Sequence, residues 1–105
     1  MKINSKPINF FATTAVNEEN SETISMLILA CYRILQKHFV DMLVIEKNDN
    51  KIKIRSAGYF FIDEYVLDEK TILGEFSINI TRKIWLKVDD YGNQYIATFV
   101  YPEER

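Results

Sequence analysis

Apolar side chains recur with a helical period in the first half of the chain. Their spacing of three and four positions places them along one side of a helix. The positions that follow this spacing are Ile24, Leu27, Ile28, Cys31, Ile34, Leu35 and Phe39. Asn17, Asn20 and Ser21 are suitable N-caps, and the glutamates around them favour the positive end of a helix dipole. The pattern predicts one long helix over residues 17–40, preceded by an extended entry segment over residues 1–16.

Beyond this helix the period of the apolar positions changes to two, which is typical of strands with one buried face. Turn-forming residues at 47–50 and 89–93 separate the alternating segments. The predicted strands are residues 42–46, 51–55, 59–67, 76–88 and 94–101. Four or five strands that follow one another through short turns form an antiparallel meander.

The alternation is longest over residues 76–88. Even positions there are apolar except Arg82, and Trp85 is the large apolar residue among the odd positions. We therefore expect the even side to face the helix and Trp85 to point outward. A buried, unpaired guanidinium is costly. Arg82 therefore requires either a bulge in the strand or a carboxylate partner, for which Asp63 and Glu64 are the candidates by strand order.

Together these elements predict an α+β fold in a single domain over residues 1–105. One long N-terminal helix (17–40) packs on a curved, four- to five-stranded antiparallel meander sheet (42–101). The pattern contains no strand-helix-strand unit, which disfavours a parallel sheet and the crossover folds that bind nucleotides. In architecture alone, this arrangement resembles the cystatin-like and NTF2-like folds.

The composition is that of an ordinary globular domain. Apolar residues make up 48% of the chain and charged residues 27%, which disfavours intrinsic disorder. The formal net charge of -2 is too small for long-range attraction to nucleic acids or membranes. The first residues include no apolar leader, and no apolar run is long enough to span a bilayer. We therefore expect a cytoplasmic protein, or a soluble piece of a larger one.

Residue types that carry catalysis or bind metals are scarce. Cys31 is the only cysteine and lies within an apolar run, so we expect a buried structural thiol. His38, the only histidine, is expected near the helix C-terminus, where its charge interacts favourably with the helix dipole. The densest acidic group lacks the spacing of a calcium loop. Its members are Asp63, Glu64, Asp68, Glu69 and Glu75. We expect no enzyme activity, no metal and no cofactor.

The outward side of the sheet is the candidate binding surface, because basic residues surround a tryptophan in the outward phase. The candidate residues are Trp85, Lys83, Lys87, Lys51, Lys53 and Arg55. Three interpretations are open. Phe10 or Phe11 of the entry segment folds over Trp85 and buries it. A protein partner with an acidic patch binds around the indole. Single-stranded nucleic acid stacks on the indole and binds the cations.

These observations favour a small, non-enzymatic protein-binding module that acts as an inhibitor, an immunity factor or an assembly component. The expected partner is another protein, and no membrane partner is expected. The alternatives are a single-stranded nucleic-acid-binding protein and a small-ligand carrier or enzyme with a cavity between helix and sheet. The uncharged strand over residues 94–101 also predicts a homodimer, provided that this strand lies at an edge of the sheet.

Overall fold

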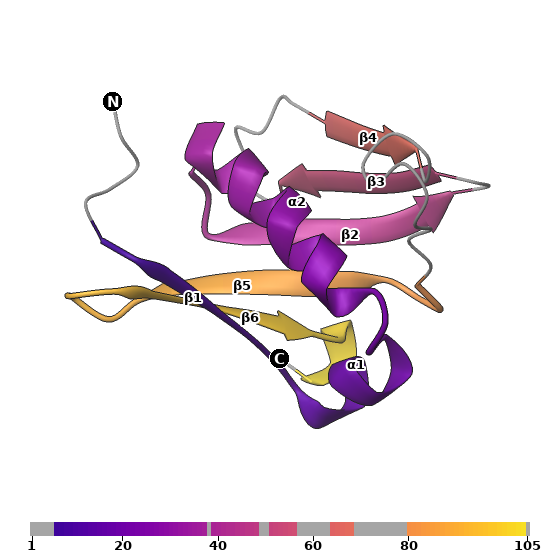
Figure 1. Cartoon of the computed structure of the whole chain (residues 1–105), viewed down its shortest axis with the longest axis horizontal. Helices are drawn as coiled ribbons and strands as arrows, with labels where there is room; N and C mark the ends of the chain where they lie inside the picture. The colour runs from indigo at the N-terminus through magenta and orange to yellow at the C-terminus, as the bar shows by residue number, and fades with distance from the viewer. Residues whose placement is uncertain (1–5, 38, 49–50, 57–63, 69–79, 105) are drawn as a thin grey trace.

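A long helix lies across one face of an open, twisted sheet (Figure 1). The computed structural model describes residues 6–37, 39–48, 51–56, 64–68 and 80–104. The strands are β1 (Ile8–Ala12), β2 (Met42–Asn48), β3 (Lys51–Ser56), β4 (Glu64–Asp68), β5 (Ile84–Asp90) and β6 (Tyr95–Val100). The helices are α1 (Thr14–Glu19) and α2 (Ile24–Lys37), and a short 3-10 helix, η1 (Pro102–Glu104), follows β6.

The strand order across the sheet is β1-β6-β5-β2-β3-β4, so β1 and β4 form its two edges. The strands from β2 to β6 pair antiparallel with one another, as predicted for four to five strands beneath one long helix. The α+β prediction is therefore confirmed. The meander order is wrong in one place, because β5 pairs with β2 in the middle of the sheet and not with β4. This pairing sets Leu43 opposite Leu86, so that both halves of the sheet share one apolar layer under α2.

The entry segment contributes a sixth strand that the sequence pattern did not predict. β1 runs parallel to β6, with Phe10 opposite Ala97 in the register. The ring of Phe10 lies 6.1 Å from that of Phe99 and 6.5 Å from that of Tyr32, which is on α2. Since β6 pairs with β5 on one side and with β1 on the other, it is not an edge strand. The expected homodimer contact through the edge of β6 is therefore wrong.

The single helix predicted over residues 17–40 is two helices that separate at Asn20. α1 begins after Thr13, whose hydroxyl accepts a hydrogen bond from the Val16 N–H (3.4 Å). Asn20 is buried at the other end of α1, where its Nδ2 donates to the Val16 carbonyl (2.9 Å) and to the Tyr101 hydroxyl (3.0 Å). Asn20 therefore ends one helix and contacts the far end of the chain, where the sequence pattern predicted an N-cap.

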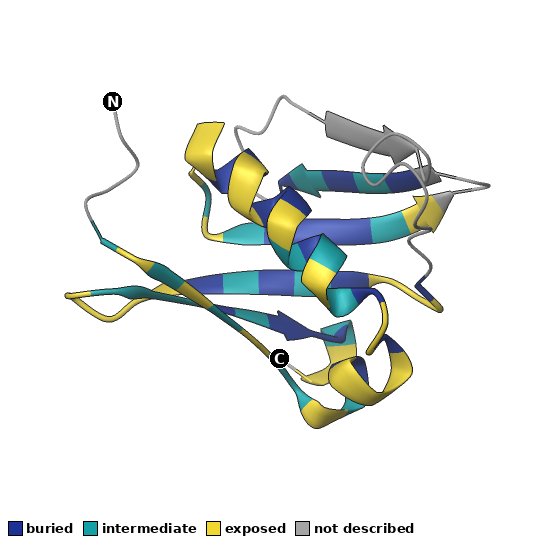
Figure 2. Ribbon diagram, viewed as in Figure 1, coloured by how far each residue is buried: buried dark blue, intermediate teal, exposed yellow. Residues whose placement is uncertain are grey.

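The apolar stripe predicted for the long helix is confirmed in α2, except that Phe39 lies beyond the end of the helix and is exposed. Figure 2 shows that the side of α2 that faces the sheet is buried and that its other side is exposed. The buried helix residues are Leu27, Ala30, Cys31, Ile34 and Leu35. They form one core with buried sheet residues that include Leu43, Ile45, Ile52, Ile54, Ile84, Leu86, Ala97 and Phe99. α2 ends at Lys37, and His38 lies outside the described residues.

The alternation predicted for residues 76–88 is confirmed in β5, over a shorter range. The even-numbered residues of β5 that face the core are Ile84, Leu86 and Val88. Trp85 lies between them in sequence and on the opposite face of the sheet. β5 begins only at Ile84, because the chain bends at Thr81 and Arg82 before it. The earlier part of the predicted strand lies outside the described residues.

Arg82 lies in this bend and is exposed. Of the two alternatives that the sequence left open, an irregularity of the strand at Arg82 is the one that the bend supports. The Arg82 Nη1 donates to Glu103 of η1 at 2.6 Å. Among the described side chains the carboxylate partners of Arg82 are Glu103 and, at a longer distance, Glu19. Of the predicted candidates, Asp63 and the side chain of Glu64 lie outside the described part of the chain. The bend turns the guanidinium away from the apolar layer, and a solvated ion pair avoids the cost of burying its charge.

Tyr101 is the centre of a polar cluster at this end of the molecule. Its side chain is fully buried, and its hydroxyl donates to Glu19 (2.6 Å) while accepting from Asn20 (3.0 Å). The guanidinium of Arg82 lies 3.5 Å from the centre of the Tyr101 ring, and its Nε lies 3.9 Å from Glu19. The cluster therefore connects α1, the bend before β5 and the segment that follows β6.

An ion pair connects the start of the described chain to the end of β5. The Nζ of Lys6 lies 2.7 Å from Oδ1 of Asp90, which also accepts a hydrogen bond from the Gly92 N–H (2.8 Å). Gly92 has a φ of 89°, which a glycine adopts without a steric penalty in this turn. The hydrogen bond from Lys6, and after it the one from Gly92, lowers the pKa of Asp90.

We expect Leu86→Ala to lower the free energy of unfolding by about 2–5 kcal/mol, because it removes a fully buried side chain and leaves a cavity. Chemical denaturation measures this loss. Leu29→Ala is the matched control, since Leu29 is 41% exposed on α2, and we expect it to cost less than about 1 kcal/mol. Equal losses in the two variants would contradict the assignment of Leu86 to the core.

We expect Lys6→Met to raise the pKa of Asp90 toward its ordinary value, because the ammonium group is the main cause of the lowered pKa. A lowered carboxyl pKa stabilises the fold above the unfolded pKa of about 4, and this stabilisation is lost as the pH falls through the folded pKa. NMR titration of the Asp90 carboxyl measures the change. Lys37→Met, at the end of α2, should leave the titration of Asp90 unaltered.

Candidate functional site

Trp85 lies in the middle of the outward face of the sheet, opposite the face that α2 covers. Within β5 its neighbours in the register are Val44 of β2 on one side and Val100 of β6 on the other. Val44 is in turn opposite Arg55 of β3, so one row of side chains crosses the sheet as Val100, Trp85, Val44 and Arg55. The register therefore places Trp85 on the outward face, as predicted.

The basic residues predicted around the indole come from the strands on either side of β2. Lys87 lies opposite Met42, and Lys53 lies opposite Glu46. Lys83 precedes β5 and is exposed. β3 and β5 are both neighbours of β2, so these groups are separated by two strand spacings, or about 10 Å. Lys51 lies at the end of β3, opposite Asn48.

Glu46 is a member of this surface that the sequence pattern did not single out. Its Oε1 lies 3.8 Å from Arg55 Nη2 and 3.9 Å from Lys83 Nζ. Both distances are long for an ion pair, and the side chains are partly solvated, so each pair contributes at most about 1 kcal/mol to stability. Glu46 reduces the positive charge of the surface without removing it. The sequence signal that could have identified it is the alternation of Glu46 with the apolar Ile45 in β2, which puts Glu46 on the outward side.

The outward face is also more apolar around Trp85 than predicted. Val44 and Val100 are only 4% and 6% exposed, although both lie outside the main core. Trp85 itself is half-buried. Phe10 does not cause this burial, because it faces α2, and Phe11 lies in edge strand β1, with β6 between it and β5. The prediction that the entry segment folds over Trp85 is therefore wrong for its described residues.

The remaining candidates for chemistry are placed as follows. Cys31 is fully buried in the core, and burial raises the pKa of its thiol, so the thiolate needed for a nucleophile is not formed at neutral pH. Within the described ranges, no three His, Cys, Asp or Glu side chains lie close enough together to hold a metal ion. None of the described helices has the length and apolar character that crossing a bilayer requires.

Comparison with known proteins identifies a solved structure with a similar fold. No protein-family model matches the chain, and no curated protein matches it. Among solved structures, the chain is similar to the crystal structure of a protein of unknown function from Enterococcus faecalis. The two are 19% identical and superpose with a TM-score of 0.59, over 100% of this chain and 96% of that chain. At this identity the likeness shows a shared fold.

The chain has a single tryptophan, so its fluorescence reports on this surface alone. We expect iodide to quench Trp85 more efficiently than caesium at equal ionic strength, because the surrounding cations attract the anion and repel the cation. Lys87→Glu should reduce the difference between the two quenchers, and Lys37→Glu, on α2, should not. Equal quenching of the folded wild-type protein by both ions would contradict a basic surface around the indole.

Proposed function

We propose that the protein is a non-enzymatic binding module that holds an acidic patch of another protein against the outward face of its sheet. Within the cell it would act in the cytoplasm as an inhibitor, an immunity factor or an assembly component. One observation carries the proposal: the register places Trp85 in a row with Val44 and Val100, and Arg55 lies two strands away in the same row. An aromatic anchor with apolar flanks and a charged rim is typical of interface hot spots.

The charges around the row support an acidic partner. Lys53, Lys83 and Lys87 lie with Arg55 on this side of the sheet, and Glu46 lies between them. Acidic positions lie farther out on the same side: Asp89 follows Lys87 in the same phase of β5, and Glu64 and Asp68 of β4 are opposite Arg55 and Lys51 in the register. Among the described side chains next to Trp85, the cations Lys83, Lys87 and Arg55 outnumber the one carboxylate, Glu46. Opposite charge on the partner would steer association and fix its orientation. The solvated part of the Trp85 indole would be the central apolar contact, since Val44 and Val100 are already buried in the free chain.

One feature favours a protein over single-stranded nucleic acid. The flanks of the indole are valines, whereas binders of single strands commonly offer several aromatic rings to successive bases. Single-stranded nucleic acid is therefore the alternative ligand that the test below must distinguish from a protein.

The test is affinity capture from the native host with matched variants, followed by binding measurements on the purified partner. We expect Trp85→Ala to weaken binding by about 2 kcal/mol or more, as for a central hot-spot residue. Lys87→Glu should slow association and reduce its dependence on salt. Lys37→Glu and Tyr91→Ala are the controls, because both residues are exposed and lie away from the Trp85 row.

Thermal unfolding of each variant separates a binding defect from a folding defect. If Trp85→Ala is destabilised, Lys87→Glu still tests the binding surface, because Lys87 is a half-buried surface residue. A labelled oligo-dT strand provides the second arm. Binding to that strand that falls steeply with salt and is lost in Trp85→Ala would replace the protein partner with nucleic acid. If all variants capture the same amount of the partner protein, the proposal is wrong.

A further inference from the structure

β1 leaves half of its backbone hydrogen-bonding groups facing away from the sheet. Its bonds to β6 include those from the Tyr95 N–H to the Pro7 carbonyl (2.9 Å) and from the Thr13 N–H to the Phe99 carbonyl (3.0 Å). Because the direction of these groups alternates along a strand, odd-numbered residues of β1 face β6. The N–H and carbonyl groups of Ile8, Phe10 and Ala12 therefore face outward, where the described part of the chain supplies no strand.

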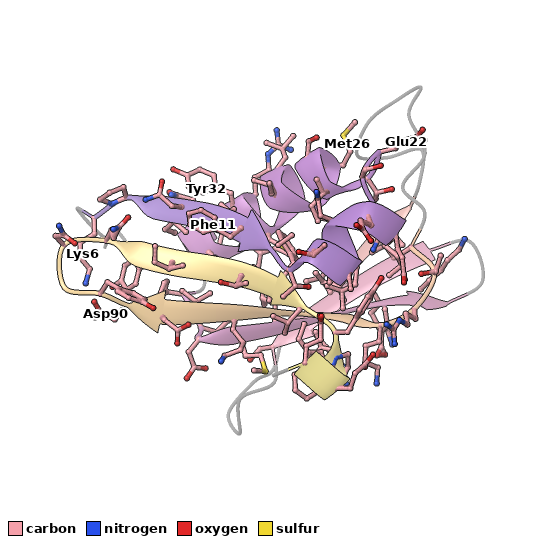
Figure 3. The ribbon with its side chains drawn as sticks, turned by 90° about the horizontal axis from the view of Figure 1, so that it is seen from below. Lys6, Phe11, Glu22, Met26, Tyr32 and Asp90 are labelled. Atoms are coloured by element: carbon pink, nitrogen blue, oxygen red, sulfur yellow. The ribbon has the colours of Figure 1, made fainter. Side chains whose placement is uncertain are left out.

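This edge lacks the usual features that protect an edge strand from pairing. Residues 8–12 contain no charged residue and no proline. Exposed aromatic rings lie on both sides of the edge: Phe11 is 55% exposed on the outward face, and Tyr32 of α2 is 43% exposed on the helix face (Figure 3). A strand that paired here would gain backbone hydrogen bonds and also cover apolar surface.

We propose that the occupant of this edge is β1 of a second copy of the chain, paired antiparallel with Phe10 opposite its own symmetry mate. In this register Ile8 of each copy lies opposite Ala12 of the other. The outward-facing N–H and carbonyl groups of Ile8, Phe10 and Ala12 in one copy then form hydrogen bonds with the same groups of the other copy, so none of them is left unpaired. Such a contact is isologous and closed, which limits the assembly to a dimer.

The side chains and charges fit this pairing. Asn9 of each copy lies opposite Phe11 of the other on the outward face, and the two Phe11 rings become diagonal neighbours within reach of each other. Beyond the ends of the strand, Lys6 of one copy approaches Glu104 of the other, since Glu104 accepts a hydrogen bond from Thr13 at the far end of β1. Within the paired strands, residues 8–12 carry no charge, so no like charges lie face to face, and Lys6, paired with Asp90 of its own chain, offers a second contact to Glu104.

The first test is the oligomeric state of the purified chain over a concentration series, measured by sedimentation equilibrium. We expect a monomer–dimer equilibrium. Phe11→Lys should raise the dissociation constant at least about tenfold, because it replaces the aromatic contact with like charges on both copies. Tyr91→Lys is the matched control, since Tyr91 is 64% exposed in the turn after β5, and it should dimerise as the wild type does.

The second test checks the register with disulfides. Non-hydrogen-bonded pairs in antiparallel strands have Cα atoms about 4.5 Å apart, within the range of a disulfide. An equimolar mixture of Asn9→Cys and Phe11→Cys should form crosslinked heterodimers under mild oxidation, whereas Asn9→Cys alone should not crosslink. The wild type is the control for Cys31, which is fully buried.

Two results would overturn the proposal. One is a wild-type chain that stays monomeric at every concentration. The other is a dimer that Phe11→Lys does not weaken and that the cysteine mixture does not trap, because the contact would then lie on another surface. Circular dichroism of Phe11→Lys confirms that it is folded. None of these measurements depends on Trp85, so they are independent of the proposed binding function.

Discussion

The antiparallel pairing of β2 with β5 is the contact on which the rest of the sheet depends. It joins the half formed by β1, β6 and β5 to the half formed by β2, β3 and β4. On the helix side this seam sets Leu43 against Leu86 and Ile45 against Ile84, and all of these side chains are buried. Because side chains alternate along a strand, a shift of one residue would turn this apolar set to the opposite face. The buried pairs therefore fix the register of the seam, and with it the position of Trp85.

Much of this could be predicted from the sequence where the signal is local. The alternation in β5 and the helical stripe of α2 each lie within one element, and both correctly identified the side that faces the core. The β2–β3 hairpin was likewise marked by its turn residues. What could not be predicted depends on distant contacts. β1 is parallel to a strand more than 80 residues away in sequence, and no periodicity within residues 8–12 indicates that partner.

Asn20 and Arg82 illustrate the same limit at the level of single residues. Asn20 has the chemistry of an N-cap, but it ends α1 because Tyr101 and the Val16 carbonyl accept its amide. Arg82 occupies an even position in an alternating segment, but a bend removes it from the strand and η1 supplies its carboxylate. For the candidate surface, the sequence predicted the side on which Trp85 lies. It did not indicate Glu46 or the valine flanks, because these depend on which strand lies beside β5.

The two proposed contacts are compatible because they use different parts of the same sheet. A two-fold axis that relates antiparallel strands runs perpendicular to the sheet, so pairing through β1 keeps the outward faces of both copies on one side. The β1 edge and the Trp85 row are separated by β6, so neither contact blocks the other. A dimer of this kind would present two Trp85 rows to the same side of a continuous sheet. A partner that carries two acidic patches, or is itself dimeric, would then bind with avidity beyond that of a single surface.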